Sequence, residues 1–414
     1  MKRSAFIRSG ALAVFAAGWG GLPAFVHAAA TEQKIIHPYK RTKTLVCIFQ
    51  RGAMDGLMAV SPYTDMNLMA LRPRLFMSPA QTEGGMFDLD GKFALHPSLV
   101  ALMPLYKENR MSVVHGVGSP NNTRSHFDAQ DFMESGMPHT KNSLTGWLNR
   151  ALTLNHQYSS PFSGVSITKS LPRSLQGEAQ SLAISNLEEF VLQNNNYGKS
   201  ANSINTSFEK LYNESNNQLL KQTGKDGFDA LKLINLEQVK HYKPADGAVY
   251  PNSPLGRSLK QIAMLIKMNV GLEIGFAESG GWDTHINQGT LNGAFARNLK
   301  DFGDSIAAFW TDLGGYQDDV SLMTMTEFGR TVHQNGTGGT DHGRASCLFL
   351  LDNSLTGGKV MHQMGGLSKE ELEDGRDLPV TTDFRSVFSA VAAHRLNITN
   401  HEKLFPGWKG RNLF

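Results

Sequence analysis

The chain has 414 residues, of which 40% are hydrophobic and 19% are charged, and this composition is that of an ordinary globular protein rather than a disordered one. The formal net charge of +3 is too small to indicate a nucleic-acid-binding protein. The order of strand-like and helix-like segments favours α/β architecture, with a single domain over residues 31–414.

The first 30 residues have the pattern of an export signal peptide. Basic residues precede a mildly apolar stretch at residues 11–26, and three alanines at residues 28–30 offer a cleavage site. The apolar stretch is short for a membrane span, so we expect no stable span after cleavage. Ser4 stands where a twin-arginine signal has its second arginine, which leaves the export route open between twin-arginine and Sec. A periplasmic or secreted location follows, with a retained N-terminal anchor as the alternative.

Residues 44–49 form an apolar, β-branched run that predicts a buried parallel strand. Asp55 follows this strand between two glycines, so we expect its carboxylate to point into a cleft; a turn aspartate before a helix is the alternative. Cys47 and Cys347 lie in separate strand-like runs. Buried thiols are the expected state, and a disulfide requires that the two strands be neighbours.

A polar loop follows the next predicted strand, residues 111–117. Ser125, with Asp128 three residues later, has the pattern of a capping box, so a helix is predicted from about residue 126. Ser125 is therefore either a nucleophile or a helix cap. Backbone N–H groups at a helix start favour an oxyanion, and His126 and Arg124 would face the same cleft.

Residues 188–245 are rich in polar side chains, and their apolar residues recur at helical spacing. This pattern predicts a helical insertion or a lid. A helix at 255–269 and a strand at 270–276 follow. That strand leads into Gly-Gly-Trp-Asp-Thr-His, in which Asp283 and His285 lie two residues apart. In extended backbone both side chains face one side and can reach one metal, whereas a structural hydrogen bond is the alternative.

The strongest signal lies between two apolar runs, residues 320–325 and 347–351, that predict core strands. The connecting loop is rich in glycine and carries Glu327, Arg330, Asp341 and His342. In open α/β sheets, ligands bind in the loops that follow the carboxyl ends of the strands. This loop is therefore one predicted wall of an active site.

These polar groups suit metal chemistry. Imidazoles and carboxylates together can hold one or two divalent metals; Zn is the first choice, with Mn, Fe or Ca as alternatives. A metal beside arginines suits ester hydrolysis at phosphorus or sulfur. No phosphate-binding GxxxxGK or GxGxxG pattern competes with this interpretation.

Six segments together resemble the secreted proteins of an uncharacterised bacterial family, often with twin-arginine signals, that is grouped with the sulfatases and alkaline phosphatases: RGAMDGL, RSHFDAQD, GGWDTH, TEFGRT, GTGGTDHG and TTDFR. The resemblance implies an alkaline-phosphatase-like three-layer sandwich, with a mostly parallel central sheet and helices on both faces. By this resemblance Asp55 matches the aspartate after the first strand, and Ser125 lies where the nucleophile belongs. Glu327 stands where an aspartate is usual.

We therefore expect an exported, sulfatase-like hydrolase that uses one or two metals to cleave phosphate or sulfate esters of small molecules or glycans. Ser125 would attack, or a metal-activated water if Ser125 is only a cap. One alternative is a non-catalytic, metal-containing binding or envelope-assembly protein on the same fold. The other is that no metal binds and the polar side chains of the loops only form hydrogen bonds with one another. The predicted ligands are Asp55, Asp283, His285 and His342 first, then Glu327, Asp341 and His126, while Arg330 and Arg124 would bind the anion.

Overall fold

A computed structural model gives the structure of the protein and describes residues 41–79, 84–141, 143–155, 160–192, 234 and 236–410. The export signal predicted at residues 1–30 lies outside these ranges. Of the insertion predicted at residues 188–245, residues 193–233 and 235 also lie outside them. The helices α8 (Leu187–Leu192) and α11 (Leu236–Lys240) flank that part and pack against each other.

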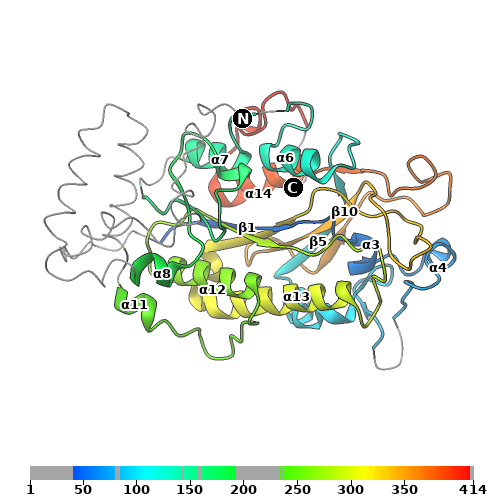
Figure 1. Ribbon diagram of the computed structural model, residues 1–414, viewed down its shortest axis with the longest axis horizontal. Coiled ribbons are helices and arrows are strands. Elements are labelled where there is room, and N and C mark those ends of the chain that lie inside the picture. Colours follow the sequence, from blue (N-terminus) through cyan, green and yellow to red (C-terminus); the bar gives the residue numbers. More distant parts are fainter. Residues whose placement is uncertain are drawn as a thin grey trace, which may run out of the picture.

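The structure is mixed α/β, built on a large and mostly parallel central sheet (Figure 1). Among the described strands of this sheet, β10 alone runs against its neighbours β5 and β9, and the other pairs are parallel. Both neighbours of β1 are parallel to it, as its continuous apolar run predicts. In spatial order the strands are β11 (Lys359–Met361), β5 (Met111–Gly118), β10 (Ser346–Leu351), β9 (Val320–Met325), β1 (Thr44–Gln50), β8 (Ile274–Ser279), β6 (Gly164–Ser166) and β7 (Ser181–Ala183), with β12 (Thr382–Asp383) on β5.

Helices cover both faces of the sheet (Figure 1). One face carries α12 (Pro254–Lys267) and α13 (Ala294–Leu313), and the other carries α6 (His126–Ser135), α7 (Trp147–Asn155) and α14 (Phe384–Leu396). The remaining elements are short: α3 (Gly56–Ala59), α4 (Met66–Leu71), α5 (Met103–Lys107), α15 (His401–Leu404), the 3-10 helices η2 (Pro97–Leu102), η3 (Arg173–Leu175) and η4 (Gly314–Asp319), and a small antiparallel sheet of β2 (Val60–Ser61), β4 (Ala94–Leu95) and β3 (Phe87–Asp88).

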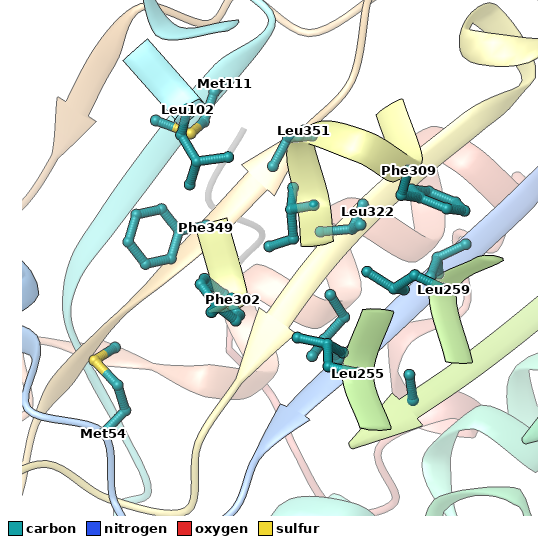
Figure 2. Close-up of a cluster of buried hydrophobic side chains, with 14 of the residues drawn as sticks. Met54, Leu102, Met111, Leu255, Leu259, Phe302, Phe309, Leu322, Phe349 and Leu351 are labelled. Atoms are coloured by element: carbon teal, nitrogen blue, oxygen red, sulfur yellow. The ribbon is translucent and has the colours of Figure 1, made fainter. Parts of the chain in front are cut away.

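A separate hydrophobic core lies on each face. On the first face, Phe302 and Phe309 of α13 and Leu259 of α12 meet Leu322 of β9 and Phe349 of β10 (Figure 2). The buried apolar residues of α12 and α13 recur three or four residues apart, so one apolar stripe of each helix faces the sheet. Burying one such side chain contributes about 1.5–3 kcal/mol, so this face holds much of the folding free energy.

On the second face, Trp147 of α7 stacks on Phe388 of α14 with ring centroids 4.8 Å apart. The C-terminal Phe405 and Trp408 pack against this pair, and both are buried. Asp383 caps α14 by accepting a hydrogen bond from the Arg385 amide, as its position before that helix predicts. Cys47 and Cys347 are free, buried thiols because β9 separates their strands.

One predicted boundary was wrong, and one helix start was confirmed. The strand predicted at residues 270–276 begins only at Ile274, because the chain after α12 first turns through Asn269 and Gly271, which both have positive φ. The helix predicted from about residue 126 begins there as α6 with Ser125 at its N-cap position, but within the described chain the Ser125 side chain makes no capping hydrogen bond. No helix in the described part of the chain has the length and apolar character of a membrane span.

Candidate metal centre

The topology brings four loops to one edge of the sheet. The parallel strands β1, β5, β8 and β9 all end there, and the reversed strand β10 begins there. The loops after β1, β5 and β8, and the loop between β9 and β10, therefore meet above this edge. All the predicted site residues lie in these loops or at the start of α6.

Glycines let these loops approach each other closely. Gly52 has φ +115°, and a Cβ there would lie 2.7 Å from the backbone nitrogen of Asp283. A Cβ on Gly339 would lie 2.3 Å from the carbonyl carbon of His285. Real Cβ atoms do not come this close to backbone atoms, so both positions require glycine.

Three imidazoles and one carboxylate converge where these loops meet. Within the described residues, His126, Asp283 and His342 each bring one ligand atom within 4.8 Å of the others. His342 lies in the middle, with its Nε2 at 3.0 Å from His126 Nε2 and 2.9 Å from His285 Nε2. Asp283 Oδ1 lies 3.6 Å from His126 Nε2, 3.0 Å from His285 Nε2 and 3.3 Å from His342 Nε2.

On the side of each histidine ring that faces away from the other donors, the Nδ1 atom lies against a hydrogen-bond acceptor. His126 Nδ1 lies 2.7 Å from Glu327 Oε1, and His285 Nδ1 lies 3.0 Å from Asp341 Oδ1. His342 Nδ1 lies 2.9 Å from the Arg124 carbonyl oxygen. Carboxylates and carbonyls only accept, so each Nδ1 carries the proton and each neutral ring turns the lone pair of Nε2 inward.

This donor set fits a metal. Converging lone pairs and a carboxylate repel each other unless a cation lies between them, and a single proton can bridge only two of these atoms. Ligands about 2.0–2.1 Å from a tetrahedral zinc are about 3.3 Å apart, close to the distances measured between the donor atoms. Histidines whose Nδ1–H is held by a carboxylate or a carbonyl are the usual form of imidazole metal ligands. The side chains of Asp283 and His285 are 46% and 38% exposed, so solvent reaches the donors.

Glu327 and Asp341, which the sequence predicted as possible ligands, therefore orient histidines instead. Glu327 is buried, and its Oε1 also accepts from the Gly52 amide at 2.9 Å and from Gln130 Nε2 at 2.9 Å. Burial raises the pKa of Glu327, but the hydrogen bonds from His126 and Gln130 outweigh it and hold that pKa below its usual range. The same His126–Glu327 bond raises the pKa of His126, while burial, and the charge that His126 carries when protonated, lower the pKa of His342.

Arg330, predicted to bind a substrate anion, is fully engaged by the protein itself. Its guanidinium is buried and donates to the carbonyls of Ala53, Gly52, Trp282 and Thr340. It also donates to Asp283 Oδ1 at 2.5 Å. Partial burial raises the pKa of Asp283, but the hydrogen bond and charge of Arg330 outweigh this and lower it. Arg330 therefore holds together the loops that carry the donors and keeps Asp283 ionised.

Asp55, predicted as a first-choice ligand, does not join the donors. Its carboxylate is buried and pairs with Arg72, with Oδ2 at 2.8 Å from Arg72 Nη1. Arg72 draws the carboxylate to its own side and so keeps it from the metal centre. Arg124 likewise turns its guanidinium to Asp377 at 2.5 Å, although it stays 33% exposed. Ser125 is exposed beside His126, with no capping bond to hold its hydroxyl.

Sequence reasoning missed three residues that support the donors. Phe328 packs against the rings of His126 and His342, with centroids 4.9 and 5.1 Å away. Gln130 links Glu327 to Arg51, whose Nη1 donates to Gln130 Oε1 at 2.9 Å. Gln130 lies one helical turn after His126, and that spacing is the signal that could have identified it.

One protein-family model matches residues 42–406, and its description is "Protein of unknown function (DUF1501)". No curated protein matches the chain.

Proposed function

The chain belongs to that family, and we propose that it is an exported, metal-dependent hydrolase of phosphate or sulfate esters. One observation carries the proposal: the Nε2 atoms of His126, His285 and His342 converge with Asp283 Oδ1 at a solvent-reachable edge of the sheet. A set of ligands with three imidazoles and one carboxylate favours Zn, Mn or Fe over Ca, because Ca prefers oxygen ligands.

Charge supports a divalent cation. With the histidines neutral, the charged side chains that contact the donors through the ion pairs described above are the carboxylates of Asp283, Glu327 and Asp341 and the guanidinium of Arg330, which sum to a formal charge of −2. A divalent metal neutralises this charge. When bound, such a metal supplies Lewis acidity, which polarises an ester oxygen and makes a water more acidic.

The residues of the chain then have separate tasks. His126, His285, His342 and Asp283 bind the cation, and Glu327 and Asp341 fix the orientation of two of the rings. Arg330 holds Asp283 in place. The attacking group is either a water or the exposed Ser125 hydroxyl beside His126, and the partly exposed Arg124 is the candidate to hold the ester anion.

The same proposal includes an alkaline-phosphatase-like fold and export from the cytoplasm. The mostly parallel sheet covered by helices on both faces is compatible with an alkaline-phosphatase-like sandwich, and the resemblance of the six segments favours it. Export is proposed from the basic and apolar pattern of residues 1–30 and the alanines before residue 31.

A second function has its own supporting observation. Protein side chains that together supply all donors of a tetrahedral metal leave no open position, which is the arrangement of structural zinc sites. A binding or envelope-assembly protein with a structural metal would use the same four side chains. The partial exposure of Asp283 and His285 favours the hydrolase.

Elemental analysis of the mature protein, beside an ester screen, tests the proposal. The hydrolase predicts about one or two transition metals per chain and metal-dependent cleavage of a phosphate or sulfate ester. Asp283→Asn and His342→Ala should lose both. Metal retained with no cleavage of any ester would favour the structural site, and a metal-free, folded wild type insensitive to chelators would contradict both functions.

A further inference from the structure

Gln288 lies beneath the metal centre and is completely buried. Its Oε1 accepts hydrogen bonds from two threonine hydroxyls, Thr284 Oγ1 at 2.9 Å and Thr340 Oγ1 at 2.8 Å. Thr284 lies between the donors Asp283 and His285 in the loop after β8. Thr340 lies two residues before the donor His342, in the loop between β9 and β10. One amide oxygen thus joins the two loops that carry three of the four donors.

The backbone repeats this connection. The Thr340 amide donates to the Thr284 carbonyl at 3.2 Å. Asn335 Nδ2 adds a bond to the His285 carbonyl at 2.8 Å. A shift of one loop relative to the other would therefore move Asp283 and His285 away from His342.

The other end of the amide is held as well. Gln288 Nε2 donates to Asp55 Oδ2 at 2.7 Å, and Arg72 Nη1 donates to the same oxygen at 2.8 Å. Arg72 also donates to the carbonyls of Thr331 and Val332, at 2.7 and 2.8 Å. A glutamine can accept from two hydroxyls and donate to a carboxylate at the same time, whereas an ionised glutamate could not donate.

We propose that Gln288 is a positioning residue that fixes the spacing of the two donor loops, and that Asp55 and Arg72 hold Gln288 in turn. Asp55 then acts on the metal centre through Gln288 and not as a ligand. The effect on metal affinity rests on the proposed function, because it assumes that the donors bind a metal. The coupling of the loops does not depend on a metal.

Amide hydrogen exchange of the metal-free protein tests the coupling directly. Gln288→Met keeps the length of the side chain and removes its hydrogen bonds. Exchange should become at least about tenfold faster in residues 283–288 and also in residues 339–343, including the Thr340 amide. Asn149→Leu is the matched control, since Asn149 is a buried amide that bonds to Leu175 and Ala179. That variant should leave exchange in both donor loops unchanged.

A second pair of variants removes one bond at a time, in case Gln288→Met does not fold. Thr340→Val deletes one hydroxyl, and Thr340→Ser restores it. The valine variant should bind Zn²⁺ about ten- to a hundredfold more weakly in a chelator competition, and the serine variant should regain wild-type affinity.

Two outcomes would overturn the proposal. One is faster exchange confined to residues 283–288 in Gln288→Met, and the other is wild-type exchange and affinity in Thr340→Val. A wild type that binds none of Zn²⁺, Mn²⁺ and Fe²⁺ would refute the metal hydrolase and leave the exchange result to decide this inference.

Discussion

The Nδ1 atom of His126 lies 2.7 Å from Oε1 of Glu327, a carboxylate with no exposed side-chain surface. The pair fixes both the tautomer and the direction of the ring, so Nε2 points at the other donors. This contact connects the buried loop after β9 to the first residue of α6.

Glu327→Gln should weaken Zn²⁺ binding about ten- to a hundredfold, because a neutral amide holds the His126 Nδ1–H less strongly than a carboxylate. Competition with a chromogenic chelator measures the affinity. Glu273→Gln is the control, since Glu273 is also buried but precedes β8 at the opposite edge of the sheet. Equal affinities in the two variants would remove Glu327 from the metal centre.

Gly52→Ala should lower the free energy of unfolding by about 2 kcal/mol or more, because φ +115° is strained for alanine and its Cβ would strike the Asp283 backbone. Gly91 also has positive φ, at +79°, but a Cβ there meets nothing within 4 Å. Gly91→Ala should therefore cost less, about 1 kcal/mol. Urea unfolding compares the two, and a Gly52→Ala variant as stable as Gly91→Ala would contradict the close approach.

Stability should fall as the pH drops from about 6.5 to about 4, because burial lowers the pKa of both His96 and His115 to about 4. In this window the unfolded chain binds protons that the folded chain does not. The contribution of the two neutral histidines to the free energy of unfolding is therefore complete above the window and lost below it. Each Nδ1 already accepts a backbone amide, from Ser98 and from Gly116, and protonation would break that bond.

Each of these histidines accounts for up to about 3 kcal/mol at the acid end of the window. Urea unfolding at several pH values should therefore show a shallower pH dependence in His115→Gln than in the wild type. Parallel curves for the two proteins would show that His115 does not titrate as its burial predicts.

Ser125→Ala should change the free energy of unfolding by less than about 0.5 kcal/mol, because the Ser125 hydroxyl makes no capping bond to α6. Asp383→Ala is the matched control, since Asp383 caps α14 through the Arg385 amide at 2.9 Å and its loss should cost about 1 kcal/mol. Thermal unfolding separates the two outcomes. Ester turnover in Ser125→Ala also identifies the attacking group. Turnover that survives in this variant assigns the attack to water, and turnover that is lost assigns it to the Ser125 hydroxyl.

The convergence of the donors could be predicted from the sequence because it depends on strand order alone. Apolar runs such as residues 320–325 predict strands, and polar residues after parallel strands meet at one edge. Asp283, His285 and His342 meet there, as expected. His126, only a second-choice ligand, belongs with them.

The direction of each side chain could not be predicted, because distant partners decide it. Asp55 turns to Arg72, which lies in a stretch with no clear pattern, and Arg330 turns to backbone carbonyls that exist only in the folded chain. Gln288 gave no signal at all, since an amide in a loop has no typical spacing to a metal site. Sequence therefore located the cluster of candidate donors better than it separated the donors from the residues that hold them.

The reversed direction of β10 has a consequence for how this protein can vary. The chain leaves β9 at the metal edge and re-enters the sheet at the same edge, so Glu327 and His342 stand at the two feet of one hairpin loop. Gly343 pairs with Gly329, and Thr331 with Asp341, so the feet are fastened to each other. The tip between these feet is fastened as well, because Asn335 donates to the His285 carbonyl and the Gln288 amide donates to the Gly338 carbonyl. A change in the length of this loop would therefore disturb the spacing of the donor atoms.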